Sequence, residues 1–214
     1  MSSISIIGTG SMAAALAGRA LAGGNAVEII GRDPARAEEL AAGLDGATVG
    51  TVGAVPVGDL VVLAVPYAGA AAVVRESGDA LRGKVIIDLT NPVSPDAGSL
   101  ATPDDSSGAR EIAKAAPAGA HVVKAFNTVF GHMLARGNAL DVLVAGDDAE
   151  AKAATSAFIT SLGLRPRDTG PLAMARWLEG TGLLMISLGR RGGSFDFALG
   201  VNTSDSTLGV NTPA

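Results

Sequence analysis

The chain has 214 residues, a formal net charge of −5 and 48% hydrophobic residues, enough apolar material for a buried core. It contains no cysteine, which excludes disulfides, a thiolate nucleophile and a cysteine metal site. It has no basic block and no run of ~18 apolar residues, so we expect neither a nucleic-acid partner nor a membrane span. The start, Met1-Ser2-Ser3-Ile4, lacks the basic region of a secretory signal, and we expect a cytoplasmic protein.

Short apolar segments recur along the first two thirds of the chain. Six of them read as buried strands: Ser3–Ile7, Ala26–Ile30, Leu60–Val65, Val85–Leu89, His121–Ala125 and Val142–Ala145. Their nearly continuous Val, Ile and Leu content is typical of a parallel sheet covered on both faces.

Helical segments alternate with these strands. Met12–Ala22 and Pro34–Leu44 are rich in Ala and Leu, and Asp33 stands where it would cap the second of them. Alternating strands and helices predict an α/β fold, a Rossmann-type doubly wound parallel sheet, over residues 1–145.

The pattern changes after residue 145. In chain order, the segments there read as a helix, a short extended piece, a second helix and a final segment: Asp148–Leu162, Arg165–Asp168, Leu172–Leu188 and Phe195–Val201. We expect residues 146–201 to form a small C-terminal domain with substrate and dimer contacts, and residues 202–214 to form a polar tail.

The first strand runs into a glycine motif, Gly8-Thr9-Gly10-Ser11-Met12. Gly8 permits a sharp turn, Gly10 lets a pyrophosphate approach the backbone, and Ala13 takes the third small position. The free amides of the first helical turn would then face the phosphate oxygens. The motif follows a strand and opens a helix, so it predicts dinucleotide binding.

The end of the second strand indicates which dinucleotide binds. An NAD site usually has an acidic residue there, whereas this chain has Gly31, followed by Arg32 and Arg36. Guanidinium groups suit a 2′-phosphate because they stay charged and offer several donors. We assign Asp33 to helix capping, and Glu28 lies too early to reach the ribose. NADP is therefore favoured over NAD.

Several short motifs occur in order along the chain. They are Gly8-Thr9-Gly10-Ser11-Met12, Arg32 with Arg36, Val65-Pro66-Tyr67, Asn91-Pro92-Val93, the VVKAFNT stretch that ends at Thr128, and Gly170-Pro171-Leu172. This series resembles the NADPH-dependent reductases of coenzyme F420, a deazaflavin hydride carrier. The resemblance extends from Ile4 to about Val201, and VVKAFNT followed by GPL is its most specific part.

The resemblance implies a Rossmann domain, a small C-terminal domain, a homodimer and direct hydride transfer between NADP(H) and coenzyme F420. By match of motif, Thr9–Met12 would hold the pyrophosphate, and Arg32 and Arg36 the 2′-phosphate. Family members often have a serine where Gly31 stands, which would remove one phosphate contact here. The remaining matches line the path from adenosine to nicotinamide or lie near the deazaflavin: Tyr67, Ala71, Val93 and Gly131 on the path, and Phe195 near the deazaflavin.

Hydride transfer between two planar rings requires no nucleophile and no obligatory side-chain proton donor, so we predict no catalytic side chain. The protein must stack the rings and exclude water. Open α/β sheets bind ligands beyond the carboxyl ends of their strands, where several apolar and amide residues of this chain stand. We expect cofactor contacts from Val65, Pro66 and Asn91, and substrate contacts from Phe126, Asn127 and Thr128.

Other conspicuous residues are given mainly structural interpretations. His121 begins a strand, where a structural role is favoured, whereas His132 is as consistent with a ligand contact as with a structural role. No residues show metal-ligand spacing, so no metal is predicted. Lys124 must be paired or lie at a strand end, and we favour a structural role.

The helix predicted over Leu172–Leu188 carries more apolar residues than one face needs. Trp177 and Met185 are therefore interpreted as core or dimer contacts, and a subunit interface would use the surplus.

Two alternatives remain open. One keeps the NADPH site but changes the acceptor to a flavin, a ferric chelate, or an imine or carbonyl metabolite. The other is a non-catalytic NADP(H) sensor that binds a partner protein. Pyrroline-carboxylate reductases and β-hydroxyacid dehydrogenases are disfavoured, because the residues after Ala145 are too few for their all-helical C-terminal domain.

Overall fold

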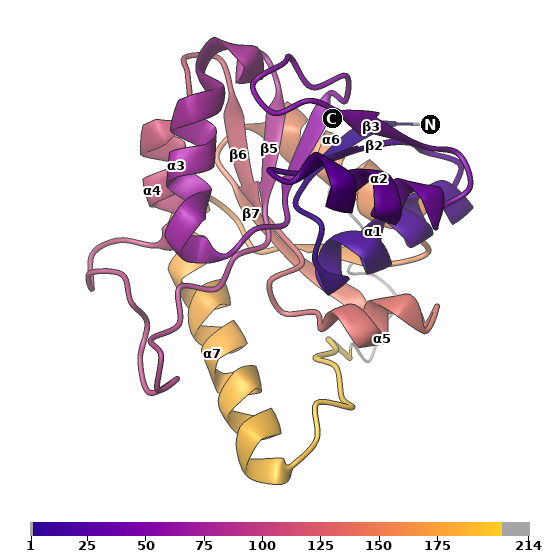
Figure 1. Cartoon of the computed structure of the whole chain (residues 1–214). Coiled ribbons are helices and arrows are strands. Elements are labelled where there is room, and N and C mark those ends of the chain that lie inside the picture. Colours follow the sequence, from indigo (N-terminus) through magenta and orange to yellow (C-terminus); the bar gives the residue numbers. More distant parts are fainter. Residues whose placement is uncertain (1, 203–214) are drawn as a thin grey trace, which may run out of the picture.

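The computed structural model describes residues 2–202 (Figure 1), and the tail expected over 202–214 lies outside them except for its first residue. The strands are β1 (Ser3–Ile7), β2 (Ala26–Ile30), β3 (Ala47–Gly50), β4 (Leu60–Leu63), β5 (Val85–Asp88), β6 (His121–Lys124), β7 (Asp141–Gly146) and β8 (Arg165–Asp168). The α-helices are α1 (Ser11–Ala22), α2 (Pro34–Ala42), α3 (Tyr67–Ser77), α4 (Gly108–Ala115), α5 (Gly131–Ala135), α6 (Ala149–Ser161) and α7 (Ala175–Gly192). Two 3₁₀ turns, η1 (Gly78–Leu81) and η2 (Leu172–Met174), complete the set.

The strands form one sheet in the order β3-β2-β1-β4-β5-β6-β7-β8. Neighbouring strands from β3 to β6 run parallel, with Ile4 paired to Val27 on one side and to Leu60 on the other. The chain winds outward from β1 in both directions, so the strand order reverses between β1 and β4. The predicted doubly wound Rossmann-type fold is confirmed, and the reversal marks the crevice where such sheets bind nucleotides.

Helices cover both faces of the sheet (Figure 1). Alternate strand residues point to opposite faces, so Leu60 and Val62 join the core under α1, α2, α5 and α6, whereas Val61 and Leu63 join the core under α3 and α4. Because both faces are buried, the strands need apolar residues at every position, which is the pattern seen in the sequence.

The structure departs from the predicted strands in two places. β3 was not predicted, because it is a four-residue edge strand with a half-exposed or exposed side chain at each position. β7 was expected in a parallel sheet, but it runs antiparallel to β6. The connection between β6 and β7 contains only the short helix α5, so the chain does not cross to the opposite edge before it re-enters the sheet.

The last helix also differs in detail from the prediction. The segment predicted over Leu172–Leu188 begins as η2 and continues as α7, which runs to Gly192 and ends with Gly193 in the left-handed conformation (φ 69°). Residues 194–202 follow without regular secondary structure. In Figure 1 they run back from the far end of α7 toward α5.

Candidate dinucleotide site

The turn after β1 requires glycine at its first position. Gly8 has φ 134°, and a Cβ there would lie 2.1 Å from the carbonyl oxygen of Ala64. Any side chain at this position would therefore force β1 and β4 apart, at the point where the strand order reverses.

The N-terminus of α1 is open. Gly10 is its N-cap residue and makes no side-chain hydrogen bond, whereas α2, α4 and α6 are capped by Asp33, Ser107 and Asp148. A Cβ at Gly10 would have no atom within 4 Å. The first-turn amides of α1 therefore face free space, which fits a pyrophosphate approaching the backbone.

The end of β2 lies beside this loop. A Cβ at Gly31 would stand 2.8 Å from Cγ2 of Thr9, so the two residues are in contact and a serine at position 31 would require the threonine to move. Arg32 and Arg36 are exposed just beyond, and Asp33 caps α2 as predicted by accepting from the amide of Ala35 at 3.1 Å. Two exposed guanidinium groups thus follow the strand whose last glycine contacts Thr9, and Nε of Arg36 lies 3.8 Å from Oδ2 of Asp33.

The start of α5 closes the other side of the loop. A Cβ at Gly131 would lie 3.5 Å from Cα of Met12, so α5 begins against the first turn of α1. Phe130, the N-cap residue of α5, packs edge-to-face against Phe195, with ring centroids 5.3 Å apart. The structure thereby brings Gly131 and Phe195 to the same side of the glycine loop.

Among the residues that follow β4, Tyr67 is bound to helix α4. Tyr67 donates its hydroxyl hydrogen to Glu111 at 2.7 Å, and its ring lies against Gly108 of α4. Burial, helped by that carboxylate, raises the pKa of Tyr67 to about 12. Val65 and Ala71 are half-buried against the core under α3, and Pro66 precedes α3 as an exposed residue.

Asn91 and Asn127 follow β5 and β6 and bind each other. Asn91 donates to the carbonyl oxygen of Asn127 at 2.7 Å, and the Asn127 amide donates to Oδ1 of Asn91 at 2.9 Å and to the carbonyl oxygen of Leu178 at 2.8 Å. A Cβ at Gly182 would lie 2.3 Å from Oδ1 of Asn91. This pair therefore joins the sheet edge to α7.

The remaining predicted residues of this edge have different surroundings. Phe126 is fully buried and packs edge-to-face on Phe158, so its side chain belongs to the core and does not line the crevice. Its φ of 62° turns the chain sharply after β6. Thr128 is buried, and its hydroxyl has no partner among the described residues. Val93 bridges to Leu100 in the loop that follows β5.

A buried charged cluster, which sequence reasoning missed, holds α7 and α4 to the sheet. Lys124 lies 2.8 Å from Oδ2 of Asp88 and 3.0 Å from Oε1 of Glu179, and all three side chains are fully buried. Glu179 also accepts from the amides of Gly108 and Ala109 at the start of α4. Lys124 was expected to be paired or to lie at a strand end, and it is both paired and the last residue of β6; Asp88, in the neighbouring strand, was the available sequence signal for the cluster.

The two histidines lie apart. His121 is exposed at the start of β6, with Nδ1 3.6 Å from Asp148, on the edge of the sheet opposite the glycine loop. His132 is exposed on α5 and stacks on Phe130, with ring centroids 5.9 Å apart.

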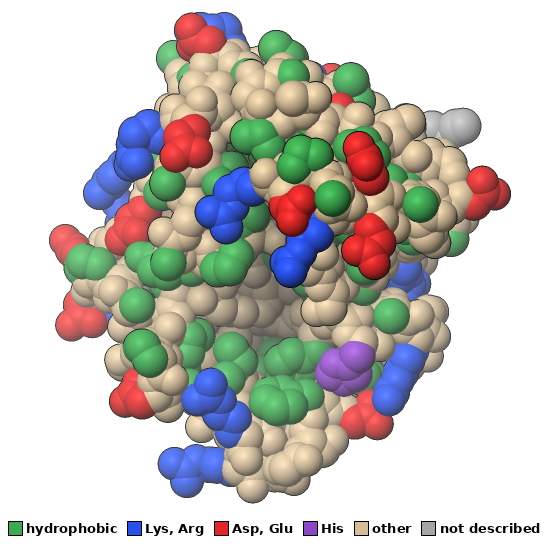
Figure 2. All heavy atoms as spheres, in the orientation of Figure 1, with side chains coloured by type: hydrophobic (Ala, Val, Ile, Leu, Met, Phe, Trp, Pro, Cys, Tyr) green, Lys and Arg blue, Asp and Glu red, His purple; other side chains and the backbone are tan. Residues whose placement is uncertain are grey.

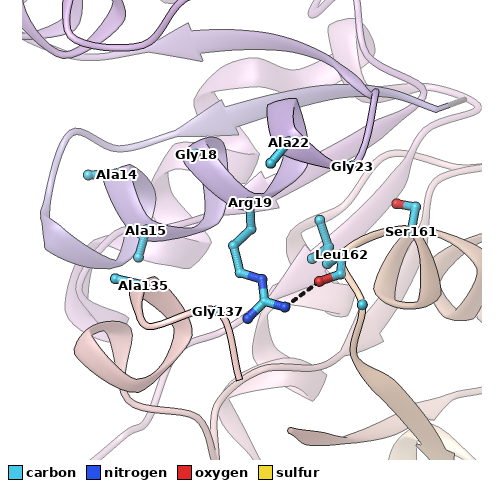
Figure 3. A pocket seen from close by; sticks show the side chains of 11 residues that line it. Ala14, Ala15, Gly18, Arg19, Ala22, Gly23, Ala135, Gly137, Ser161 and Leu162 are labelled. Atoms are coloured by element: carbon cyan, nitrogen blue, oxygen red, sulfur yellow. Dashed lines mark hydrogen bonds between the residues drawn. The ribbon is translucent and has the colours of Figure 1, made fainter. Parts of the chain in front are cut away.

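A groove of about 580 Å³ lies between α1, α5 and the end of α6 (Figure 3). Its walls are small residues of α1, and its one guanidinium, from Arg19, is used to join three segments of backbone. Arg19 donates to the carbonyl oxygens of Leu162, Asn138 and Leu134 at 2.5, 2.9 and 3.2 Å. Burial lowers the pKa of Arg19. The groove is thus a structural junction at the opposite end of α1 from the open amides.

Among residues 2–202, no helix has the length and apolar content that crossing a membrane requires.

Comparison with known proteins identifies relatives. Residues 3–92 match the family model described as NADP oxidoreductase coenzyme F420-dependent. The chain is similar in structure to a protein from Arthrobacter sp. FB24 with a provisional assignment as an F420-dependent NADP-reductase, at 27% identity and TM-score 0.83 over 94% of this chain and 99% of that one. A hypothetical protein from Sinorhizobium meliloti is 28% identical, with TM-score 0.72 over 81% of this chain and 87% of that one.

A curated relative is much longer. Metalloreductase STEAP3 of Rattus norvegicus is 31% identical over 186 residues, which is 86% of this chain but only 37% of the length of STEAP3. The family match covers β1 to β5 and includes the glycine loop and both arginines. Residues 3–92 of the chain therefore match the family of coenzyme F420-dependent NADP oxidoreductases, and nearly the whole chain has the fold of a protein provisionally assigned to that activity.

Proposed function

We propose that this protein transfers a hydride between NADP(H) and the deazaflavin coenzyme F420. The observation that carries the proposal is the open, glycine-lined start of α1, beside Arg32 and Arg36, in a chain that matches this family model. Main-chain amides suit a pyrophosphate, and the two guanidinium groups that follow Gly31 suit a 2′-phosphate.

The chain's own residues would bind and orient the cofactor. Gly10 leaves space for the pyrophosphate at the α1 amides, and Gly131 bounds that space from α5. When bound, NADPH supplies a hydride, and the deazaflavin takes up that hydride and one proton from solvent. The protein contributes ring alignment and exclusion of water, for which no catalytic side chain is required.

A second acceptor is favoured by one specific observation. The curated relative is a metalloreductase, and it is 31% identical to this chain over 186 residues, which is 86% of the chain. Reduction of a metal complex such as a ferric chelate, with electrons from NADPH, is therefore the second candidate.

The direct test mixes the purified chain with NADPH and oxidised coenzyme F420 and follows the loss of deazaflavin absorbance. We expect one NADPH to be oxidised for each F420 reduced. Parallel reactions replace F420 with FMN or with a ferric chelate. Absence of F420 reduction at acidic, neutral and alkaline pH, with turnover of the ferric chelate, would favour the second candidate. Tight NADPH binding without turnover of any acceptor would favour a sensor.

We also propose that the protein is a homodimer that associates through α7. Trp177, Leu184 and Leu188 are 67%, 71% and 61% exposed and recur along one side of this helix. Such a stripe stabilises association when a second copy covers it. Sedimentation should give a dimer mass for the wild type and a monomer mass for Leu184→Asp with Leu188→Asp. A monomeric wild type would contradict this proposal.

The division into residues 1–145 and a C-terminal unit over 146–201 also stays a proposal. β7 and β8 continue the sheet of the first unit, whereas α7 and the segment after it extend beyond the sheet.

A further inference from the structure

Arg19 of α1 binds the C-terminal ends of two other helices. Its Nη1 donates to the carbonyl oxygens of Leu134, in the last turn of α5, and of Asn138, and its Nη2 donates to that of Leu162, which ends α6 (Figure 3). The last carbonyls of a helix have no partner within the helix, and a cation there also meets the negative end of the helix dipole. One side chain of α1 therefore fixes the position of both helix ends.

The helix α5 depends on such contacts because it is short. It has five residues, fewer than an isolated helix needs to be stable, so tertiary contacts decide where it lies. At its start, a Cβ at Gly131 would be 3.5 Å from Cα of Met12, and near its end Leu134 is bound by Arg19. α1 thus holds α5 at both ends, and loss of the Arg19 contacts would leave α5 free to tilt about Gly131.

The position of α5 bears on one half of the proposed cofactor site. Gly131 bounds the space beside the open amides of α1, on the side where we expect the nicotinamide. Figure 2 shows a hollow on this face of the molecule, with hydrophobic side chains and a histidine along its lower margin, where Figure 1 places α5. A tilt of α5 would change this margin, whereas Arg32 and Arg36 follow β2 and are not among the groups that Arg19 binds.

We propose that Arg19 is a positioning residue for hydride transfer, which holds α5 against α1 and so sets where the nicotinamide ring lies, without touching the cofactor. This inference rests on the proposed function, through the cofactor path past Gly131. Alignment matters in ring-to-ring hydride transfer because a displacement of about 1 Å can lower the rate about 100-fold.

Two substitutions of Arg19 and one control test the proposal. Arg19→Met removes the three hydrogen bonds and keeps an unbranched side chain. The groove beside Arg19 has a volume of about 580 Å³, so water can reach the released carbonyls and the variant should fold. Arg19→Lys keeps the charge but offers a single nitrogen to three carbonyls, so its effect should be intermediate. Arg75→Met makes the same change at an exposed arginine in the last turn of α3 and is the matched control.

Two ligands separate a positioning role from general damage to the fold. Adenosine 2′,5′-bisphosphate carries the 2′-phosphate and one phosphate for the glycine loop but no nicotinamide, whereas NADP⁺ carries all three. In calorimetric titrations of the full chain, Arg19→Met should bind the bisphosphate within about twofold of the wild type and NADP⁺ about 10-fold more weakly. For Arg19→Lys we expect a loss of NADP⁺ affinity of about threefold, and Arg75→Met should match the wild type with both ligands.

The rate of the chemical step gives a second measurement. At saturating NADPH, the single-turnover rate of hydride transfer to F420 should fall about 10-fold or more in Arg19→Met. Unchanged NADP⁺ affinity in Arg19→Met would overturn the positioning role, and so would an equal loss of affinity for both ligands. If Arg19→Met does not fold, the same two titrations of Arg19→Lys decide by the same criteria.

Failure of the proposed function gives a different result. If the wild type binds NADP⁺ but does not reduce F420, and Arg19→Met loses affinity for NADP⁺ alone, the role of Arg19 stands and the proposed acceptor falls. A wild type that binds neither ligand would overturn both proposals.

Discussion

The two ends of the proposed active site are built in different ways. At the nucleotide end, the shape is set by four glycines, Gly8, Gly10, Gly31 and Gly131, and the charged groups, Arg32 and Arg36, are exposed. At the acceptor end, α7 is held by side chains from distant parts of the chain, including the buried cluster of Lys124, Asp88 and Glu179.

This difference predicts how the stability of the protein responds to substitutions at the two ends. A local backbone turn fails only when its own glycines change, whereas a tertiary ionic cluster fails when any member is removed. Substitution of Arg32 or Arg36, which are exposed, should therefore lose binding without losing stability, whereas removal of a member of the buried cluster should lower stability first.

The largest stability effect is expected for Lys124→Met. The change leaves the carboxylates of Asp88 and Glu179 buried without their cation, and breaking such a cluster costs about 3–5 kcal/mol. At about 2–4 °C per kcal/mol for a chain of this size, the melting temperature should fall by roughly 6–20 °C.

The matched control is Arg82→Met, which removes an exposed ion pair to Asp79 at 2.7 Å. It should change the melting temperature little, because exposed pairs contribute about 0–1 kcal/mol. Equal melting temperatures for the Lys124 variant and the wild type would contradict the structural role of the cluster.

The next effect concerns cofactor choice. Arg32→Ala with Arg36→Ala should weaken NADPH binding about 100-fold, because two charge-assisted contacts of about 1.5 kcal/mol each are lost. NADH lacks the 2′-phosphate and should bind nearly as before. Titrations of both nucleotides by fluorescence provide the measurement, and equal losses for the two would refute the assignment.

A smaller effect is pH-dependent and concerns Asp141, which accepts a hydrogen bond from the amide of Val201. Burial alone would raise the pKa of Asp141, but hydrogen bonds from Arg165, from the amide of Val201 and from Arg167 together lower it to about 2. A lowered folded-state pKa stabilises the native state above the unfolded pKa of ~4, and that stability is lost as pH falls toward 2.

The wild type should therefore exceed Asp141→Asn by about 2 kcal/mol in free energy of unfolding at pH ~5, and by progressively less as pH approaches ~2. Urea unfolding of both proteins across this range gives the difference directly. Asp59→Asn, at an exposed carboxylate 3.6 Å from Lys84, is the control and should change the free energy of unfolding by no more than about 1 kcal/mol. If the difference in free energy of unfolding between the wild type and Asp141→Asn stays constant with pH, the lowered pKa of Asp141 is not its cause.

The same contrast explains how far the sequence could be interpreted. Patterns of neighbouring residues predicted the glycine loop, the cap at Asp33 and six strands, because each of these features depends on local spacing. The position of Phe126 in the core could not be inferred, since it depends on Phe158 from a later helix. Likewise, nothing local to Glu179 signals that it binds Lys124 and the start of α4.

The most direct measurement is a calorimetric titration of Gly10→Ala with NADP⁺. The added Cβ meets no protein atom within 4 Å, so the fold and melting temperature should be unchanged. It would occupy the free space beside Gly10 where we propose that the pyrophosphate binds, and NADP⁺ affinity should fall at least 10-fold, about 1.4 kcal/mol. A stably folded Gly10→Ala variant that binds NADP⁺ as tightly as the wild type would contradict the account.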